Sequence, residues 1–129
     1  MYNLNSMKWT KPSRQLIEIF NDVVPGDKGV DRRKMFGYPC AFKNGNMFMG
    51  LHEKNMFLRL SKEDRDAFLE LNQAGQFEPM PGRILREYVV VPFRILKDKE
   101  QLKEWIRKSL AYVSSLPPKP KKKQKSVNR

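Results

Sequence analysis

Two side chains in this sequence have the chemistry for covalent catalysis, the lone cysteine and the lone histidine. Cys40 and His52 fall in a segment that predicts consecutive strands, so they could lie close together as nucleophile and base. No third residue stands at a spacing that would orient the histidine, and free cysteine is among the most often buried residue types. The sequence therefore favours a structural role for Cys40 and an exposed His52, and it predicts no catalytic residue.

Metal and phosphate sites are not indicated either. One cysteine and one histidine cannot complete a zinc site without distant carboxylates, and no ligand spacing is present. The acidic residues are scattered among basic ones, so nothing pairs them for general acid–base catalysis. The seven glycines fall mostly at turns and form no phosphate-binding loop. We expect a protein that is not an enzyme, with no cofactor, no metal and no small-molecule substrate.

Basic residues are the most obvious functional feature. The formal net charge is +12, and half of this excess lies in 119–129, which has no acidic residue. We expect 1–118 to form a single domain and 119–129 to be a disordered tail. Lysines on such a tail can bind nucleic acid weakly and without sequence preference, or they can simply keep the chain soluble. The candidate nucleic-acid contacts in the tail are Lys119, Lys121, Lys122, Lys123 and Lys125.

A second basic group is predicted if the loop before the last strand folds back over the first strand. Its members share exposed positions and a positive charge, and they are Arg32, Arg33, Lys34, Arg83 and Arg86. Arginines so grouped could hold an anion or an acidic partner. The alternative is a solvated rim, the usual place of exposed arginines.

The segment 32–60 predicts a four-strand antiparallel meander that must position these residues. Asn44-Gly45 stands between two apolar runs and is the strongest short-range hairpin signal, because a type I′ turn needs positive φ at both central residues. Breaks at 37–39 and 53–55 separate the other strands. Alternation puts Met47, Met49 and Leu51 on one face of the sheet and Phe48 and His52 on the other.

Helical spacing of apolar residues predicts three helices, over 10–24, 61–75 and 98–116. Three consecutive valines predict a fifth strand over 87–91, and 76–83 is expected to be irregular. The order is helix, four strands, helix, strand, helix. This order predicts an α+β fold with two layers, an antiparallel sheet of about five strands and helices mainly on one face.

An uncovered sheet face would carry apolar side chains. The candidates for a partner surface on that face are Phe48, Phe57, Tyr88 and Val90. An apolar patch on a domain surface usually marks a protein partner or a homodimer contact. The alternative is that the N-terminal segment or a helix covers these side chains.

Short motifs spread from about 12 to 118 resemble the N-terminal domain of the TfoX (Sxy) family. They are Lys34-Met35-Phe36-Gly37, Phe42, Asn44-Gly45, Met47-Phe48, the run 78–82, the strand 88–91 and the helix through Trp105. The resemblance implies a two-layer domain with an antiparallel sheet, of a kind also compared with secretion-chaperone folds. Larger family members regulate bacterial DNA-uptake competence, together with a transcription factor. Those regulators carry a helical domain where this chain has its lysine tail.

The leading hypothesis is a non-enzymatic binding module that acts through protein–protein contacts and in transcriptional, competence-type regulation. The alternative hypothesis is a nucleic-acid-associated protein that uses the lysine-rich tail. One cysteine, no signal-peptide pattern and no long apolar run predict a cytoplasmic protein without membrane contact.

Overall fold

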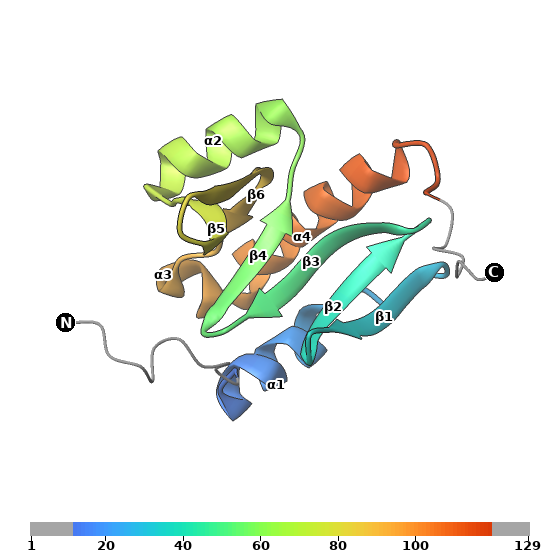
Figure 1. Ribbon diagram of the computed structural model, residues 1–129, viewed down its shortest axis with the longest axis horizontal. Coiled ribbons are helices and arrows are strands. Elements are labelled where there is room, and N and C mark those ends of the chain that lie inside the picture. The colour runs from blue at the N-terminus through green and yellow to red at the C-terminus, as the bar shows by residue number, and fades with distance from the viewer. Residues whose placement is uncertain (1–11, 120–129) are drawn as a thin grey trace.

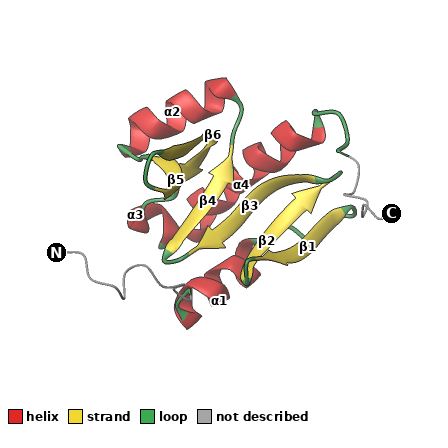
Figure 2. Ribbon diagram, in the orientation of Figure 1, coloured by secondary structure: helices red, strands yellow, loops and turns green. Residues whose placement is uncertain are grey.

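The computed structural model describes residues 12–119, which form one antiparallel sheet with helices on one side (Figures 1 and 2). The strands are β1 (Val30–Met35), β2 (Tyr38–Lys43), β3 (Asn46–His52), β4 (Asn55–Arg59), β5 (Gln76–Met80) and β6 (Arg83–Val90). The helices are α1 (Arg14–Val23), α2 (Lys62–Asn72), α3 (Phe93–Leu96) and α4 (Lys99–Ser114). The α+β class and the antiparallel sheet predicted from the sequence are confirmed.

Local sequence explains where the helices begin. The Ser61 and Asp98 side chains accept backbone hydrogen bonds from Asp64 and Gln101, as expected for N-caps of α2 and α4. Ser13 does the same for α1 by accepting from the Leu16 N–H. Each cap satisfies a helix N–H that has no partner within its own helix, which fixes the helix start.

All four helices contribute to one core on one face of the sheet. The sheet order is β1-β2-β3-β4-β6-β5, and α1 and α4 lie across its back in Figure 1. Phe20, Phe68 and Ile95 from three helices join the buried face of α4 against the sheet. The Phe68 and Trp105 rings meet edge to face, with centroids 4.8 Å apart, which ties α2 to α4. The prediction that helices cover mainly one face is confirmed.

The sheet has six strands rather than about five, because the segment expected to be irregular forms a strand. β5 pairs antiparallel with β6 across a turn at Pro81-Gly82, where Gly82 has a φ of +81°. Proline followed by a glycine with positive φ is the sequence of a type II turn. Pro79 is tolerated in β5 because this strand lies at the sheet edge, where a missing N–H costs no ladder bond. The last strand is also longer than the predicted 87–91, since it begins at Arg83.

An irregularity in the β2–β3 pairing changes which side chains face the core. Ala41 pairs with Met49 and Phe42 pairs with Met47, so Phe48 has no partner in the register. An extra residue of this kind breaks the strict alternation of side chains. Phe48 and Met49 therefore both lie in the helix-covered core, each fully buried. The prediction that Phe48 lies on the open face is wrong, because the alternation argument assumed a regular strand.

The irregular position is closed by a serine of α4. The Ser109 hydroxyl lies 2.7 Å from the Phe48 carbonyl oxygen and 2.6 Å from the Arg59 carbonyl oxygen, and Ser109 is fully buried. Its single hydrogen is shared between two carbonyls that the β3–β4 ladder does not pair. A polar side chain in the middle of the core face of α4 thus follows from the irregularity in β3.

Replacing Ser109 should show how much free energy is lost when the Phe48 and Arg59 carbonyl oxygens have no hydrogen-bond donor. We expect Ser109→Ala to lower the free energy of unfolding by about 1–3 kcal/mol, because buried carbonyls lose their donor without access to water. Urea denaturation followed by Trp fluorescence measures the change. The matched control is Ser115→Ala at the exposed end of the same helix, expected within about 0.5 kcal/mol of the parent. Equal effects of the two substitutions would contradict the assignment.

Candidate functional site: an apolar groove on the open sheet face

The sheet face opposite the helices carries a second, smaller apolar layer. Tyr38, Cys40, Phe57 and Phe77 are buried but do not belong to the main core. The Phe57 and Phe77 rings stack with centroids 4.4 Å apart and an angle of 15° between their planes. Phe77 belongs to β5, so the edge hairpin β5–β6 covers part of the face that the helices leave open.

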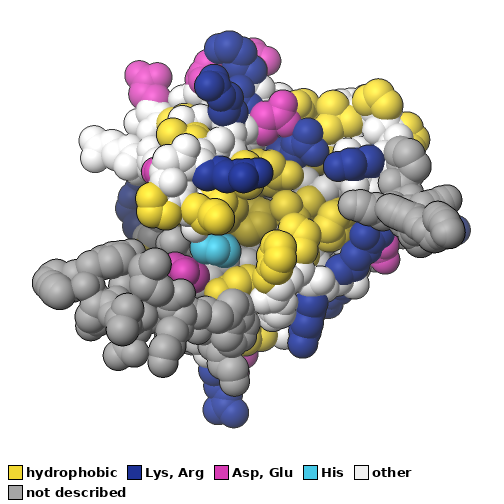
Figure 3. Space-filling model, in the orientation of Figure 1, with side chains coloured by type: hydrophobic (Ala, Val, Ile, Leu, Met, Phe, Trp, Pro, Cys, Tyr) yellow, Lys and Arg dark blue, Asp and Glu magenta, His cyan; other side chains and the backbone are white. Residues whose placement is uncertain are grey.

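A groove of about 140 Å³ remains between this hairpin and the β1–β2 turn. Its lining is almost wholly apolar, and it includes Met35, Phe36, Tyr38, Cys40, Met47, His52, Phe57, Phe77, Pro79 and Leu85. Figure 3 shows this face as a band of hydrophobic side chains that includes the histidine and has Lys and Arg side chains along its borders. A concave apolar surface of this kind is the default place to look for binding.

Gly50 makes the floor of the groove possible. A Cβ at this position would lie 2.7 Å from the Phe57 Cζ and 2.9 Å from the Cys40 Cβ. The absence of a side chain lets the Phe57 ring lie flat across β3, where Phe77 can then stack on it. The glycine is required here for close packing rather than for an unusual backbone conformation.

The remaining predicted surface residues lie on the open face, but they are less accessible than expected. Phe57 is 4% exposed, since Phe77 covers it, and Val90 pairs with Phe57 across β4 and β6. Tyr88 meets the Phe57 ring edge to face and its hydroxyl donates to the Met47 carbonyl oxygen over 3.3 Å. Burial raises the pKa of Tyr88, which keeps that donor protonated. These residues support the groove from below, and whether they contact a partner stays a prediction.

Sequence analysis missed the residues that form the rim of the groove. Phe36 and Met35 are exposed at the β1–β2 turn, Phe36 to 84%. Phe36 and Gly37 have φ values of +54° and +85°, the signs of a type I′ turn, like Asn44 and Gly45. A phenylalanine is an unfavourable residue at such a φ, whereas asparagine is the usual one. The phenylalanine before Gly37 was the sequence signal for this exposed rim, because it occupies a turn position at which Asn is usual.

The second basic group does not assemble as predicted. Its members lie far apart on β1 and on β6, because three strands separate the first strand from the β5–β6 hairpin. Arg32 donates to the Asn21 side chain on α1, and Arg33 pairs with Asp31 on its own strand. Lys34 is exposed on the same side of β1 as Arg32, near α1. Arg83 and Arg86 are exposed on β6, so the two halves can contact one ligand only across the groove.

The lysine tail is described at its first residue alone. The Lys119 N–H donates to the Asn44 carbonyl oxygen over 2.7 Å, and the Asn46 amide donates to the Pro117 carbonyl oxygen. Lys119, the last described residue, therefore lies beside the β2–β3 turn. Lys121, Lys122, Lys123 and Lys125 lie outside the described residues, and their predicted contact with nucleic acid stays a prediction.

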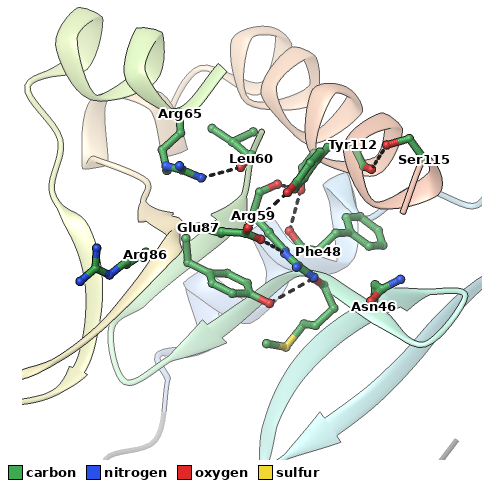
Figure 4. Close-up of polar contacts among 12 residues, drawn as sticks. Asn46, Phe48, Arg59, Leu60, Arg65, Arg86, Glu87, Tyr112 and Ser115 are labelled. Atoms are coloured by element: carbon green, nitrogen blue, oxygen red, sulfur yellow. Dashed lines mark hydrogen bonds and ion pairs between the residues drawn. The ribbon is translucent and has the colours of Figure 1, made fainter. Parts of the chain in front are cut away.

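A polar cluster lies where β4, β6 and α4 meet (Figure 4). Arg59 donates to Glu87 over 2.7 Å, and the Tyr112 hydroxyl donates to the other Glu87 carboxylate oxygen over 3.3 Å. The Arg59 guanidinium also lies within 6 Å of the Tyr88 and Tyr112 ring centroids. These contacts neutralise the arginine charge and hold it in place, so the cluster joins the two layers rather than offering a free cation.

Cys40 and His52 both line the groove but do not form a catalytic pair. The Cys40 thiol lies 3.7 Å from the Tyr38 carbonyl oxygen, and the His52 ring packs between the Tyr38 and Phe77 rings. Burial raises the pKa of Cys40 to about 11, so the thiol is neutral near pH 7. His52 is half-buried, which corrects the expectation of an exposed side chain. Within 12–119, no group of three or more Cys, His, Asp or Glu residues could hold a metal ion.

The TfoX N-terminal domain family matches residues 22–113, from the end of α1 to the last turn of α4. The chain belongs to this family. Membership indicates a regulatory or binding module, and TfoX N-terminal domains are not known as an enzyme family. A comparison with curated proteins gave no match. Among the described residues of this TfoX domain, no helix is long and apolar enough to cross a bilayer.

The role of Gly50 in the TfoX domain leads to a stability prediction. We expect Gly50→Ala to lower the free energy of unfolding by about 1–3 kcal/mol, because the added methyl group overlaps the Cys40 Cβ and displaces the Phe57 ring. Urea denaturation measures the change, and the methyl signals of Met47 report on the groove by NMR. Gly75→Ala is the matched control, since a Cβ there meets no atom within 4 Å. An unchanged stability of Gly50→Ala would show that the aromatic floor does not depend on this close contact.

The buried thiol should react slowly in the folded domain. Its pKa is raised from 9.0 to about 11, so at pH 8 the thiolate fraction should fall roughly a hundredfold relative to the unfolded chain. We expect native Cys40 to react with a disulfide reagent at least tenfold more slowly than the same thiol in urea. The difference should narrow as the pH rises above 9. A native rate equal to or above the unfolded rate would revive Cys40 as a nucleophile.

Proposed function

We propose that this TfoX domain is a non-enzymatic regulatory module that binds another protein through the groove on its open sheet face. The observation that carries the proposal is Phe36, which projects from the β1–β2 turn in a backbone conformation that disfavours phenylalanine. Keeping this residue costs local stability of about 1–2 kcal/mol. Backbone strain clusters at binding sites, so its presence at an exposed phenylalanine supports a role in binding.

The surroundings of Phe36 fit the same role. Met35 is also exposed, and both side chains continue the apolar lining of the groove outward to the solvent. Exposed apolar side chains that join a concave apolar surface are typical of protein interaction sites. Family membership supports a binding or regulatory module, and the buried neutral Cys40 gives no support to a covalent mechanism. Competence-type transcriptional regulation is the biological setting that the family suggests for such a module.

The substitution Phe36→Asn separates binding from folding. Asn-Gly is the preferred type I′ turn, so Phe36→Asn should raise the free energy of unfolding by about 1 kcal/mol while removing the projecting ring. On an affinity column that carries the domain, we expect the variant to retain at least tenfold less of the protein partner than the parent domain retains. Urea denaturation and quantitative mass spectrometry of the retained proteins measure the two effects.

The matched control is Phe93→Ser, which removes another exposed phenylalanine from α3, away from the groove lining. It should retain the same partner as the parent. A Phe36→Asn variant that binds its partner as the parent does would overturn the proposed function. A variant that is less stable than the parent would overturn the strain argument.

A further inference from the structure

We propose that the partner is an acidic segment of another protein that inserts one large apolar side chain into the groove between the β1–β2 turn and the β5–β6 hairpin. This inference rests on the proposed function and specifies the chemistry of what binds. Three features of the described residues support it, namely the size of the groove, the shape of its rim and the charge beside the rim.

The size of the groove fits a single side chain. Its volume of about 140 Å³ is well below the roughly 300–1,000 Å³ of sites that enclose metabolites or drug-sized ligands. It is close to the roughly 150 Å³ of a cavity that holds one benzene ring. A groove of this size therefore suits one anchoring residue of a longer ligand, such as phenylalanine or leucine. Tight interfaces commonly place a few such anchors in desolvated pockets.

The shape of the rim provides contacts for the chain on either side of the anchor. Met35 and Phe36 form one wall, and Pro79 and Leu85 form the opposite wall on the β5–β6 hairpin. The two walls belong to hairpins at opposite edges of the sheet, so the groove is open at the solvent side and a peptide can cross it. Phe57 and Phe77 lie beneath the two walls and are only 4% and 5% exposed. They therefore form the floor of the groove and do not offer exposed ring faces for stacking.

The charge beside the rim selects an acidic ligand. β1 carries Arg33, which shares the open face with Met35 and pairs with Asp31, and Lys34, which is exposed on the other face of the strand and among the described residues makes no ion pair. Across the groove, Arg83 opens β6 two residues before Leu85. Of the acids near the groove in the chain, Glu53 follows His52 on the β3–β4 turn, and Glu78 already accepts the Gly82 N–H over 2.6 Å. The positive charge of the domain adds long-range attraction for such a ligand.

The same charges argue against other occupants. A second copy of the chain would bring like charge to the groove, since residues 1–118 carry 20 basic and 14 acidic residues. The N-terminal segment 1–11 contains Lys8 and Lys11 and no acidic residue. Nucleic acid binding on a sheet uses exposed aromatic faces, whereas the rings of this floor are covered. An acidic protein segment with one apolar anchor is the occupant that fits both the size and the charge.

The test is an NMR titration of the ¹⁵N-labelled full chain with a synthetic peptide in which one phenylalanine is flanked on both sides by glutamates and aspartates. The expected result is a set of shifted amide signals at Phe36, His52 and Phe77, with binding at least tenfold weaker for a peptide with alanine in place of phenylalanine. A peptide with lysines in place of the acids should also bind at least tenfold more weakly. Equal binding of the lysine peptide, or shifts that lie away from the groove, would overturn the proposal.

Charge reversal on the protein provides a second readout. The double substitution Arg33→Glu with Lys34→Glu should weaken acidic-peptide binding at least tenfold while leaving the groove lining intact. The double substitution Lys103→Glu with Lys108→Glu on the exposed side of α4 changes the net charge by the same amount, and as the matched control it should bind within twofold of the parent. An equal loss in both variants would show that only net charge matters, which would overturn a specific docking site.

Three further outcomes identify a different occupant and would each overturn the proposal. The first is a change of the groove amide shifts with protein concentration. The second is a difference in these shifts between the Trp9→Ala variant and the parent when no peptide is present. The third is a change of these shifts when a single-stranded oligonucleotide is added. They point to a second copy, the N-terminal segment and nucleic acid, respectively. Failure of the acidic peptide together with a partner that is lost in Phe36→Asn would overturn this inference and leave the proposed function standing.

Discussion

The packing of an aromatic ring over Gly50 is the contact on which the open face depends. Because β3 has no side chain at that point, the Phe57 ring lies across the strand, 2.7 Å from where a Cβ would stand. Phe77 stacks on this ring and draws the β5–β6 hairpin over the sheet. The hairpin then forms one wall of the groove, and the His52 ring fits between Phe77 and Tyr38. One missing methyl group therefore shapes a surface to which all six strands contribute side chains.

The two faces of the sheet are stabilised by different means. The helix-covered face is a conventional apolar core, and Ser109, the one fully buried polar side chain in the described part of the chain, compensates for the irregularity at Phe48. The open face is held by stacked and edge-to-face rings and by the Arg59–Glu87–Tyr112 cluster, which joins β4, β6 and α4 at the sheet end. The first face makes the fold stable, and the second keeps a shallow apolar surface in a fixed shape. A surface that is already formed loses less conformational entropy when a ligand binds.

The β1–β2 turn shows where local stability and binding conflict. At the β2–β3 turn the chain uses Asn44-Gly45, which suits the positive φ values of both positions. At the β1–β2 turn it uses Phe36-Gly37 with the same signs of φ, although the bulky side chain is unfavourable there. Natural sequences are expected to depart from local rules mainly at functional sites. The difference between two turns of one sheet is thus the clearest local sign of where this domain makes contact.

The sequence by itself determined the elements whose signals are local. Asn44-Gly45 predicted the central hairpin, Ser61 and Asp98 predicted two helix starts, and the spacing of Leu102, Trp105, Ile106 and Leu110 predicted α4, because turns, caps and amphipathic stripes depend on neighbouring residues. Tertiary structure alone decided that Phe48 turns into the core, since a one-residue irregularity reverses the alternation and leaves no sequence signal. It also decided that three strands separate Arg33 from Arg83, and that Phe77 covers Phe57, because strand order and ring stacking depend on residues that are distant in the chain. The groove could not be predicted for the same reason. Its walls come from the β1–β2 turn and the β5–β6 hairpin, and only the complete sheet brings these two hairpins to one surface.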